Sequence, residues 1–168
     1  APATYAAGPA VYGQLNLSVD SLDNGTNSAF NVSSNSSRLG IKGDIPIRDG
    51  LAGIYQIETE VNADTGGTSS SGNPSTSGVA AFASRNTFAG LQSDFGTVRI
   101  GRFDTPVKLI GRQVDLFQDQ VGDARNLTRG TNSAARFDER ANNSIAYTSP
   151  TLAGFYGIAQ YASNTDNA

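Results

Sequence analysis

Residues 38–61 read RLGIKGDIPIRDGLAGIYQIETEV, and this stretch decides the fold. In its first half, odd-numbered positions hold the apolar residues Leu39, Ile41 and Ile45. Even-numbered positions hold the charged residues Arg38, Lys42 and Asp44. In its second half, the same alternation sets Tyr55, Ile57 and Val61 against Gln56, Glu58 and Glu60. A period of two predicts strands, and Asp49-Gly50 between the halves predicts a tight turn. The stretch is therefore expected to form an antiparallel hairpin with one apolar and one charged face.

The same period recurs along the rest of the chain. Further strands are expected at residues 11–20, 85–91, 97–101, 140–149 and 155–161. With the hairpin's two, they make seven. Short turns at 49–50, 93–96 and 149–154 alternate with long loops at roughly 21–36, 62–83 and 103–139. A compact soluble domain rarely carries three loops of this length, whereas short turns at one end and long loops at the other are typical of outer-membrane barrels.

Composition narrows the function classes. The chain has 168 residues, enough for one domain, and a net charge of -3, so no basic surface is expected to hold nucleic acid. It contains no Cys and no His, which removes disulfides, thiolate nucleophiles, ordinary zinc sites and the commonest general base. We expect no cofactor. No apolar run reaches the 18 or so residues of a membrane-spanning helix, which leaves a barrel open.

Two alternatives fit part of this pattern. A secreted β-sandwich also has alternating strands, but the polar faces here gather Arg, Lys and Glu, which favours a barrel. Glu58 and Glu60 lie on one strand face about 6.5–7 Å apart, a separation that suits an inverting glycosidase. Because Trp is absent and nothing else builds a sugar cleft, we interpret both as polar residues lining a lumen and expect no catalytic residue.

Six segments, in order, resemble the Gram-negative general diffusion porins. They are residues 11–16, 37–43, 88–91, 95–102, 104–106 and 142–150. The resemblance implies an all-β fold, a sixteen-stranded antiparallel transmembrane β-barrel. It also implies a homotrimer that is integral to the bacterial outer membrane and contacts its lipid. The family's third loop folds into the lumen, and residues 104–139 correspond to this constriction loop.

The function implied by the resemblance is passive diffusion of small hydrophilic solutes and ions through a water-filled channel. In the family, basic side chains on the wall face acidic groups on the inward loop and create a transverse field. The matching basic residues are Arg38, Arg85 and Arg140, and Lys42 extends the row. The acidic side is assigned to Asp115, Asp119 and Asp123, whose spacing of four predicts a short helix with all three on one side. The wall arginines indicate a preference for anions, which the aspartates and the net charge make weak.

Seven strands cannot close a single-chain bacterial barrel, which takes an even number from eight upward. We therefore expect residues 1–168 to be the N-terminal portion of a single porin barrel domain. The alternative from another class is a structural or adhesive β-protein that assembles through its strand edges.

Overall fold

The structure, a computed structural model, describes residues 8–23, 25–65, 82–120, 122–124 and 138–163. Nine strands and one helix lie within these ranges. The strands are β1 (Ala10–Gln14), β2 (Leu17–Asp23), β3 (Ser28–Ser34), β4 (Arg38–Arg48), β5 (Leu51–Glu60), β6 (Thr87–Ser93), β7 (Gly96–Asp104), β8 (Arg140–Thr148) and β9 (Ile158–Ala162). The helix is α1 (Pro106–Val114).

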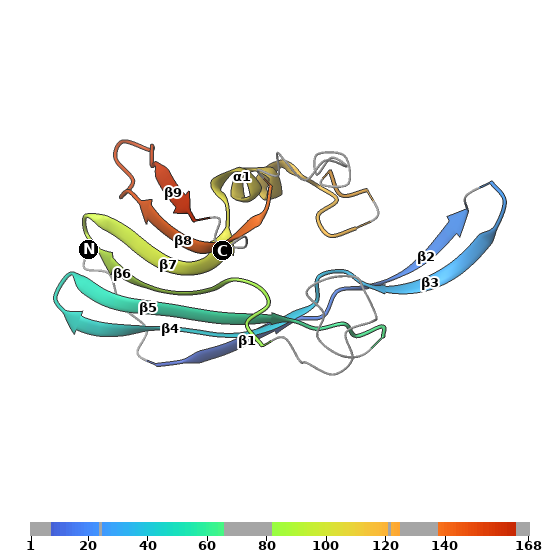
Figure 1. The fold of residues 1–168 in the computed structure, drawn as a ribbon, viewed down its shortest axis with the longest axis horizontal. Coiled ribbons are helices and arrows are strands. Elements are labelled where there is room, and N and C mark those ends of the chain that lie inside the picture. The colour runs from blue at the N-terminus through green and yellow to red at the C-terminus, as the bar shows by residue number, and fades with distance from the viewer. Residues whose placement is uncertain (1–7, 24, 66–81, 121, 125–137, 164–168) are drawn as a thin grey trace.

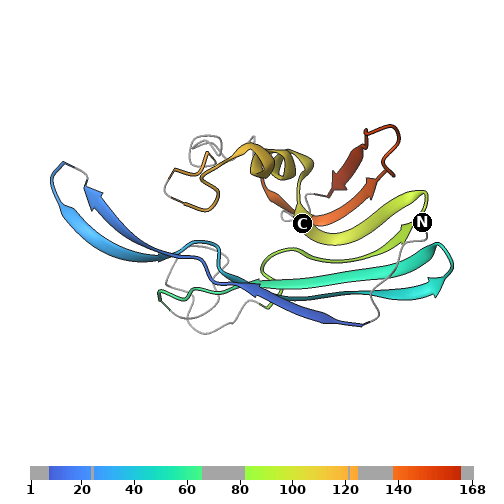
Figure 2. The ribbon, with the colours of Figure 1, turned by 180° about the vertical axis from the view of Figure 1, so that it is seen from behind.

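Seven strands form one antiparallel sheet in the order β1-β4-β5-β6-β7-β8-β9. The sheet curls into an open trough, and the two-stranded β2–β3 hairpin projects beyond one end of it (Figures 1 and 2). The trough does not close into a barrel, since β1 and β9 lie at the two edges of the sheet. The prediction of an all-β antiparallel meander is confirmed.

The two sides of the sheet differ in chemistry. One side is apolar and exposed: Val11, Leu39, Ile41, Ile45, Leu91, Val98, Ile100 and Ile145 belong to it. Among the described residues, the only buried hydrophobic side chains are Ala52, Phe103 and Ala146. A β-sandwich would bury one apolar face in a dry interior, but Ile41 is 38% exposed and Leu15 is 73% exposed. The sheet therefore turns its apolar side outward and its charged side into the trough.

The turn expected at Asp49-Gly50 is confirmed, and Gly50 has the positive φ of 71° that favours glycine. The expected loop at 21–36 is wrong, because most of it belongs to the β2–β3 hairpin. There Val19 pairs with Val32, and Ser21 pairs with Phe30. The strand expected at 11–20 is divided into β1 and β2 at Leu15-Asn16.

Two strands begin later than expected, at Thr87 in β6 and at Ile158 in β9. Before β9 the chain makes a tight turn that pairs Leu152 with Phe155, and Ala153 and Gly154 both have positive φ. Such a turn cannot be part of a strand. Of the loop expected at 62–83, residues 66–81 lie outside the described ranges.

The segment expected as a loop at 103–139 contains the end of β7 and all of α1. Pro106 stands in the first turn of α1, where its missing N–H costs nothing. The helix ends at Val114, so the helix predicted through Asp115, Asp119 and Asp123 is wrong. The Asp115 carboxylate accepts the Phe117 N–H at 2.9 Å, and this local bond competes with helix formation. Among the described residues, no helix has the length and apolar character needed to cross a membrane.

Candidate functional site

Glu58 organises a group of charges on the trough side of β5. Its carboxylate accepts the Nε–H of Arg85 at 2.8 Å and the hydroxyl of Tyr12 at 2.8 Å, and Arg38 Nε lies 4.0 Å away. Arg85 also lies 3.6 Å from Glu60. The side chains of Arg85 and Glu58 are only 5% and 7% exposed. Both charges are thus largely removed from water, and each supplies the partner that the other requires.

Tyr12 reaches Glu58 by crossing β4. Tyr12 pairs with Gly40 in the β1–β4 register, and Gly40 pairs with Glu58 in the next. A Cβ at position 40 would come within 2.5 Å of the Tyr12 ring. Gly40 is therefore needed for the ring to pass over the strand and for its hydroxyl to reach the carboxylate.

A second group forms around Asp104 at the end of β7. Asp104 Oδ1 lies 3.0 Å from Lys108 Nζ of α1 and 3.1 Å from an Arg140 guanidinium nitrogen of β8. Asn86 donates to Asp104 Oδ2 at 3.0 Å and accepts the Nε–H of Arg140 at 2.7 Å. Since Asn86 follows Arg85 in the chain, the two groups adjoin. We call them together the wall cluster: Tyr12, Arg38, Glu58, Glu60, Arg85, Asn86, Asp104, Lys108 and Arg140.

Two further cations share the trough side of the sheet but contact aromatic rings. Lys42 Nζ lies 5.2 Å from the centre of the Tyr12 ring. The Arg99 guanidinium carbon lies 4.9 Å from the Phe103 ring centre and 5.3 Å from that of Phe88. These distances are those of cation–π contacts.

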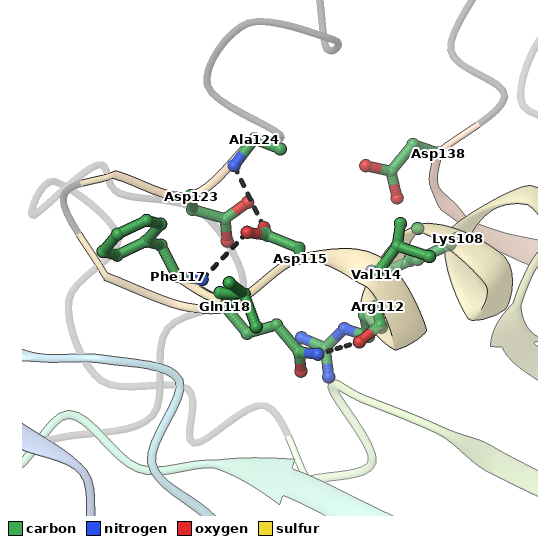
Figure 3. A pocket seen from close by; sticks show the side chains of 11 residues that line it. Lys108, Arg112, Val114, Asp115, Phe117, Gln118, Asp123, Ala124 and Asp138 are labelled. Carbon is green, nitrogen blue, oxygen red and sulfur yellow. Dashed lines mark hydrogen bonds between the residues drawn. The ribbon is translucent and has the colours of Figure 1, made fainter.

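The three aspartates after α1 hold their own segment in shape. Asp115 accepts the backbone N–H groups of Phe117 at 2.9 Å and Ala124 at 3.0 Å, as Figure 3 shows. Asp123 accepts the Asp119 N–H at 2.9 Å, and Asp119 lies 2.9 Å from Arg112 of α1. Asp115 and Asp123 also line a cavity of about 420 Å³ beside α1. Their carboxylates are thus engaged mainly within the segment.

This segment also reaches across the trough. Gln120 donates to the side-chain oxygen of Asn16 at 3.3 Å, although the two residues are 104 positions apart. Asn16 lies between β1 and β2, at one edge of the sheet, whereas α1 follows β7 near the other (Figure 1).

The sequence placed Arg38, Arg85, Arg140 and Lys42 on one polar face. The structure brings Arg38 and Arg85 together through Glu58, while Arg140 joins the adjacent Asp104 group and Lys42 stays apart over Tyr12. Sequence reasoning missed Asp104 and Lys108 as members of this cluster. Their i, i+4 spacing across the start of α1 was an available signal, but it required knowing that a helix begins there.

Among the described residues, no group of three or more His, Cys, Asp or Glu side chains is arranged to hold a metal ion. The chemistry that the wall cluster offers is electrostatic: it presents fixed charges and hydrogen-bonding groups to the space inside the trough.

Comparison with known proteins fits this architecture. The sequence model of the Gram-negative porin family matches residues 1–168. The major outer membrane protein P.IB of Neisseria sicca is 34% identical over 132 residues, which are 79% of this chain and 32% of that protein. The protein of the same name from Neisseria meningitidis serogroup B is 33% identical over 132 residues, 79% of this chain and 34% of that protein. The chain spans about a third of the length of these relatives.

Solved structures show the same fold. An anion-selective porin from Comamonas acidovorans superposes with a TM-score of 0.71 at 26% identity, covering 92% of this chain and 46% of that one. A loop L8 deletion mutant of OmpT, an outer membrane protein of Vibrio cholerae, superposes with a TM-score of 0.67 at 21% identity, covering 96% and 45%. The chain is an integral protein of the bacterial outer membrane. It belongs to the Gram-negative porin family, a class of channels rather than of enzymes.

Proposed function

We propose that this chain lines a water-filled outer-membrane channel through which small hydrophilic solutes and ions diffuse passively. The observation on which the proposal rests is that the two faces of the sheet have opposite chemical character. The apolar side is exposed, as a surface in contact with lipid must be, while the charged wall cluster occupies the other side. A lumen lined by charged and hydrogen-bonding groups lets hydrated solutes pass without a binding step.

The segment 104–139 acts as the constriction loop of this channel. The hydrogen bond from Gln120 to Asn16 supports this role, because it joins the segment to a distant edge of the trough. Arg38, Arg85, Arg140 and Lys42 form the basic wall, and Asp115, Asp119 and Asp123 belong to the acidic loop. The part of this loop at residues 125–137 lies outside the described ranges.

The channel prefers anions weakly. The trough side carries six basic groups described above, Arg38, Lys42, Arg85, Arg99, Lys108 and Arg140. Against them stand Glu58, Glu60, Asp104 and also Asp44, which shares the face of Lys42 on β4. The three aspartates after α1 oppose this excess of two positive charges, but Asp119 is paired with Arg112, and Asp115 and Asp123 accept backbone N–H groups of their own segment. The similarity to an anion-selective porin also supports a preference for anions.

The channel is a homotrimer of barrels, as its family membership suggests. The apparent mass of the unheated protein on a detergent gel checks this stoichiometry, and monomers under native conditions would contradict it.

Conductance tests the proposal. The full-length protein, inserted into a planar bilayer, should give single-channel steps, and a salt gradient should give a reversal potential on the anion side. Arg38→Gln should shift that potential toward cations, because Arg38 is the most exposed arginine of the wall cluster and its removal leaves Glu58 less neutralised. Arg85→Gln should shift it in the same direction.

The control is Arg48→Gln, because Arg48 is exposed at the β4–β5 turn, away from the wall cluster. Clear cation preference in the unmodified protein would overturn the anion assignment while leaving the channel intact. Ordered oligomers without conductance would instead favour the structural or adhesive alternative, in which sheet edges such as β1 and β9 pair between chains.

A further inference from the structure

The cations on the trough side of the sheet fall into two groups. Arg38, Arg85, Arg140 and Lys108 each lie within 4.0 Å of a carboxylate of the wall cluster. Lys42 and Arg99 form the other group, whose contacts are aromatic rings. Among the described residues, the side chain of Arg99 has no ion pair and no hydrogen bond, and its guanidinium lies over the rings of Phe88 and Phe103. The charge of Arg99 is therefore the least neutralised among the arginines of this face.

Arg99 is also held in a defined position. The Phe88 and Phe103 rings meet edge to face at 83°, with 6.0 Å between their centres, and Phe103 is only 2% exposed. Two packed rings against a guanidinium limit the rotamers that the arginine can adopt. Contacts with ring faces leave the in-plane N–H groups unused, because these point along the edge of the guanidinium plane.

The neighbouring strands leave room for the arginine. In the register of the sheet, Arg99 pairs with Gly90 of β6 and Ala146 of β8. A Cβ at position 90 would come within 3.2 Å of Arg99 Cγ and 2.3 Å of the Val98 carbonyl oxygen. Glycine at 90 thus lets the arginine stem run across β6 toward Phe88. Neither Gly90 nor Ala146 has a side chain long enough to cover the guanidinium.

We propose that Arg99 is an oxyanion-binding residue of the lumen wall. This inference rests on the proposed channel function and deepens it: the residue that selects among anions is Arg99, rather than the arginines that are paired with carboxylates of the wall cluster. The planar fork of N–H donors matches the two oxygens of a carboxylate or a phosphate, which a lysine at the same place would not match. Solutes that carry such a group are the class it would take.

Reversal potentials of the full-length protein test the proposal, with inorganic phosphate and acetate as the probes and chloride as the reference anion. The potentials are measured at about 0.1 M ionic strength, where the Debye length of about 10 Å leaves a charge beside the passing anion little screened and suppresses the influence of more distant charges. Arg99→Gln should lower the permeability of phosphate and acetate relative to potassium by about fivefold, the effect of one unit charge about 4 Å away in water. Arg48→Gln removes an equal charge at the β4–β5 turn and should change neither ratio.

Two further variants separate charge from geometry. Arg99→Lys keeps the charge and should retain chloride permeability while losing the preference for phosphate and acetate over chloride. Phe88→Leu removes one ring that orients the guanidinium and should weaken that preference in the same way. If Arg99→Gln does not insert into the bilayer, Arg99→Lys and Phe88→Leu alone test the proposal.

The outcomes distinguish the two proposals. If Arg99→Gln conducts normally and its permeabilities to phosphate and acetate relative to potassium are unchanged, the proposed role of Arg99 is wrong. The same holds if both Arg99→Lys and Phe88→Leu keep the preference for phosphate and acetate over chloride. Either result would leave the proposed channel function unaffected. Absence of conductance in the unmodified protein would overturn the channel itself.

Discussion

At the scale of single residues, Glu58 joins three other segments of the chain. It contacts Tyr12 of β1, Arg38 of β4 and Arg85 before β6 with one carboxylate. Buried charges are costly unless they are paired, so removal of one partner is more damaging than loss of the pair would be. Glu58 therefore positions two of the wall arginines as well as neutralising them.

Glu58→Gln should lower the free energy of unfolding by roughly 3 kcal/mol, because Arg85 keeps its burial and loses its nearest counterion. Urea unfolding in detergent micelles measures the change. Glu60→Gln is the matched control: Glu60 is 28% exposed and 3.6 Å from Arg85, and its loss should cost about 1 kcal/mol or less. Equal effects of the two substitutions would contradict the special role of Glu58.

Among the elements, α1 has an unusual orientation. Its charged residue Lys108 is buried against Asp104, whereas Val107, Ile110 and Val114 are half exposed or more. A helix on a soluble domain would do the opposite. The ion pair with Asp104 therefore attaches α1 to β7, and through Asp104 to Arg140 of β8.

Lys108→Met keeps the length of the side chain and removes this ion pair. We expect faster cleavage of the segment after α1 by added protease, since the attachment of the helix is weakened by about 1–3 kcal/mol. Limited proteolysis of the protein in detergent, followed by mass spectrometry, measures the rate. Lys42→Met removes a cation of the same face whose described contact is the Tyr12 ring, and it should leave the rate unchanged.

The whole molecule is organised by the two faces of its sheet. Hydrophobic burial between elements contributes little, as the three buried apolar side chains among the described residues indicate. Backbone pairing along the seven strands and contact of the outer face with lipid must supply the stability instead.

Ile100→Arg tests whether the outer face of the sheet contacts lipid, because Ile100 is 55% exposed at the middle of β7 on that face. Arginine on a lipid-facing strand should destabilise the folded protein by about 2–4 kcal/mol near the middle of the bilayer. Gln56→Arg places the same side chain on the trough side of β5 and should cost far less. Folding yield into lipid vesicles measures both, and equal yields would show that the outer face does not contact hydrocarbon.

Most of the sheet was predictable from the sequence, because the alternation that decides which side chains share a face is a local property of each strand. The strands around Ile41, Ile57 and Ile145 were found in this way. The strand β3 at residues 28–34 was not, since its Ser and Asn residues are also typical of loops and only pairing with β2 orders them. The helix predicted through Asp119 failed because its aspartates bond to nearby backbone groups instead.

The sequence by itself determined the strand faces, the tight turn at Gly50 and the polar character of the residues that line the trough. Only the tertiary structure decided which charges neutralise one another. Tyr12, Glu58 and Arg85 meet because Gly40 admits a ring across β4, whereas the guanidinium of Arg99 lies over Phe88 and Phe103 and has no carboxylate partner in the part of the chain that the structure describes. Such partnerships depend on the register of distant strands, which alternation along one strand does not specify.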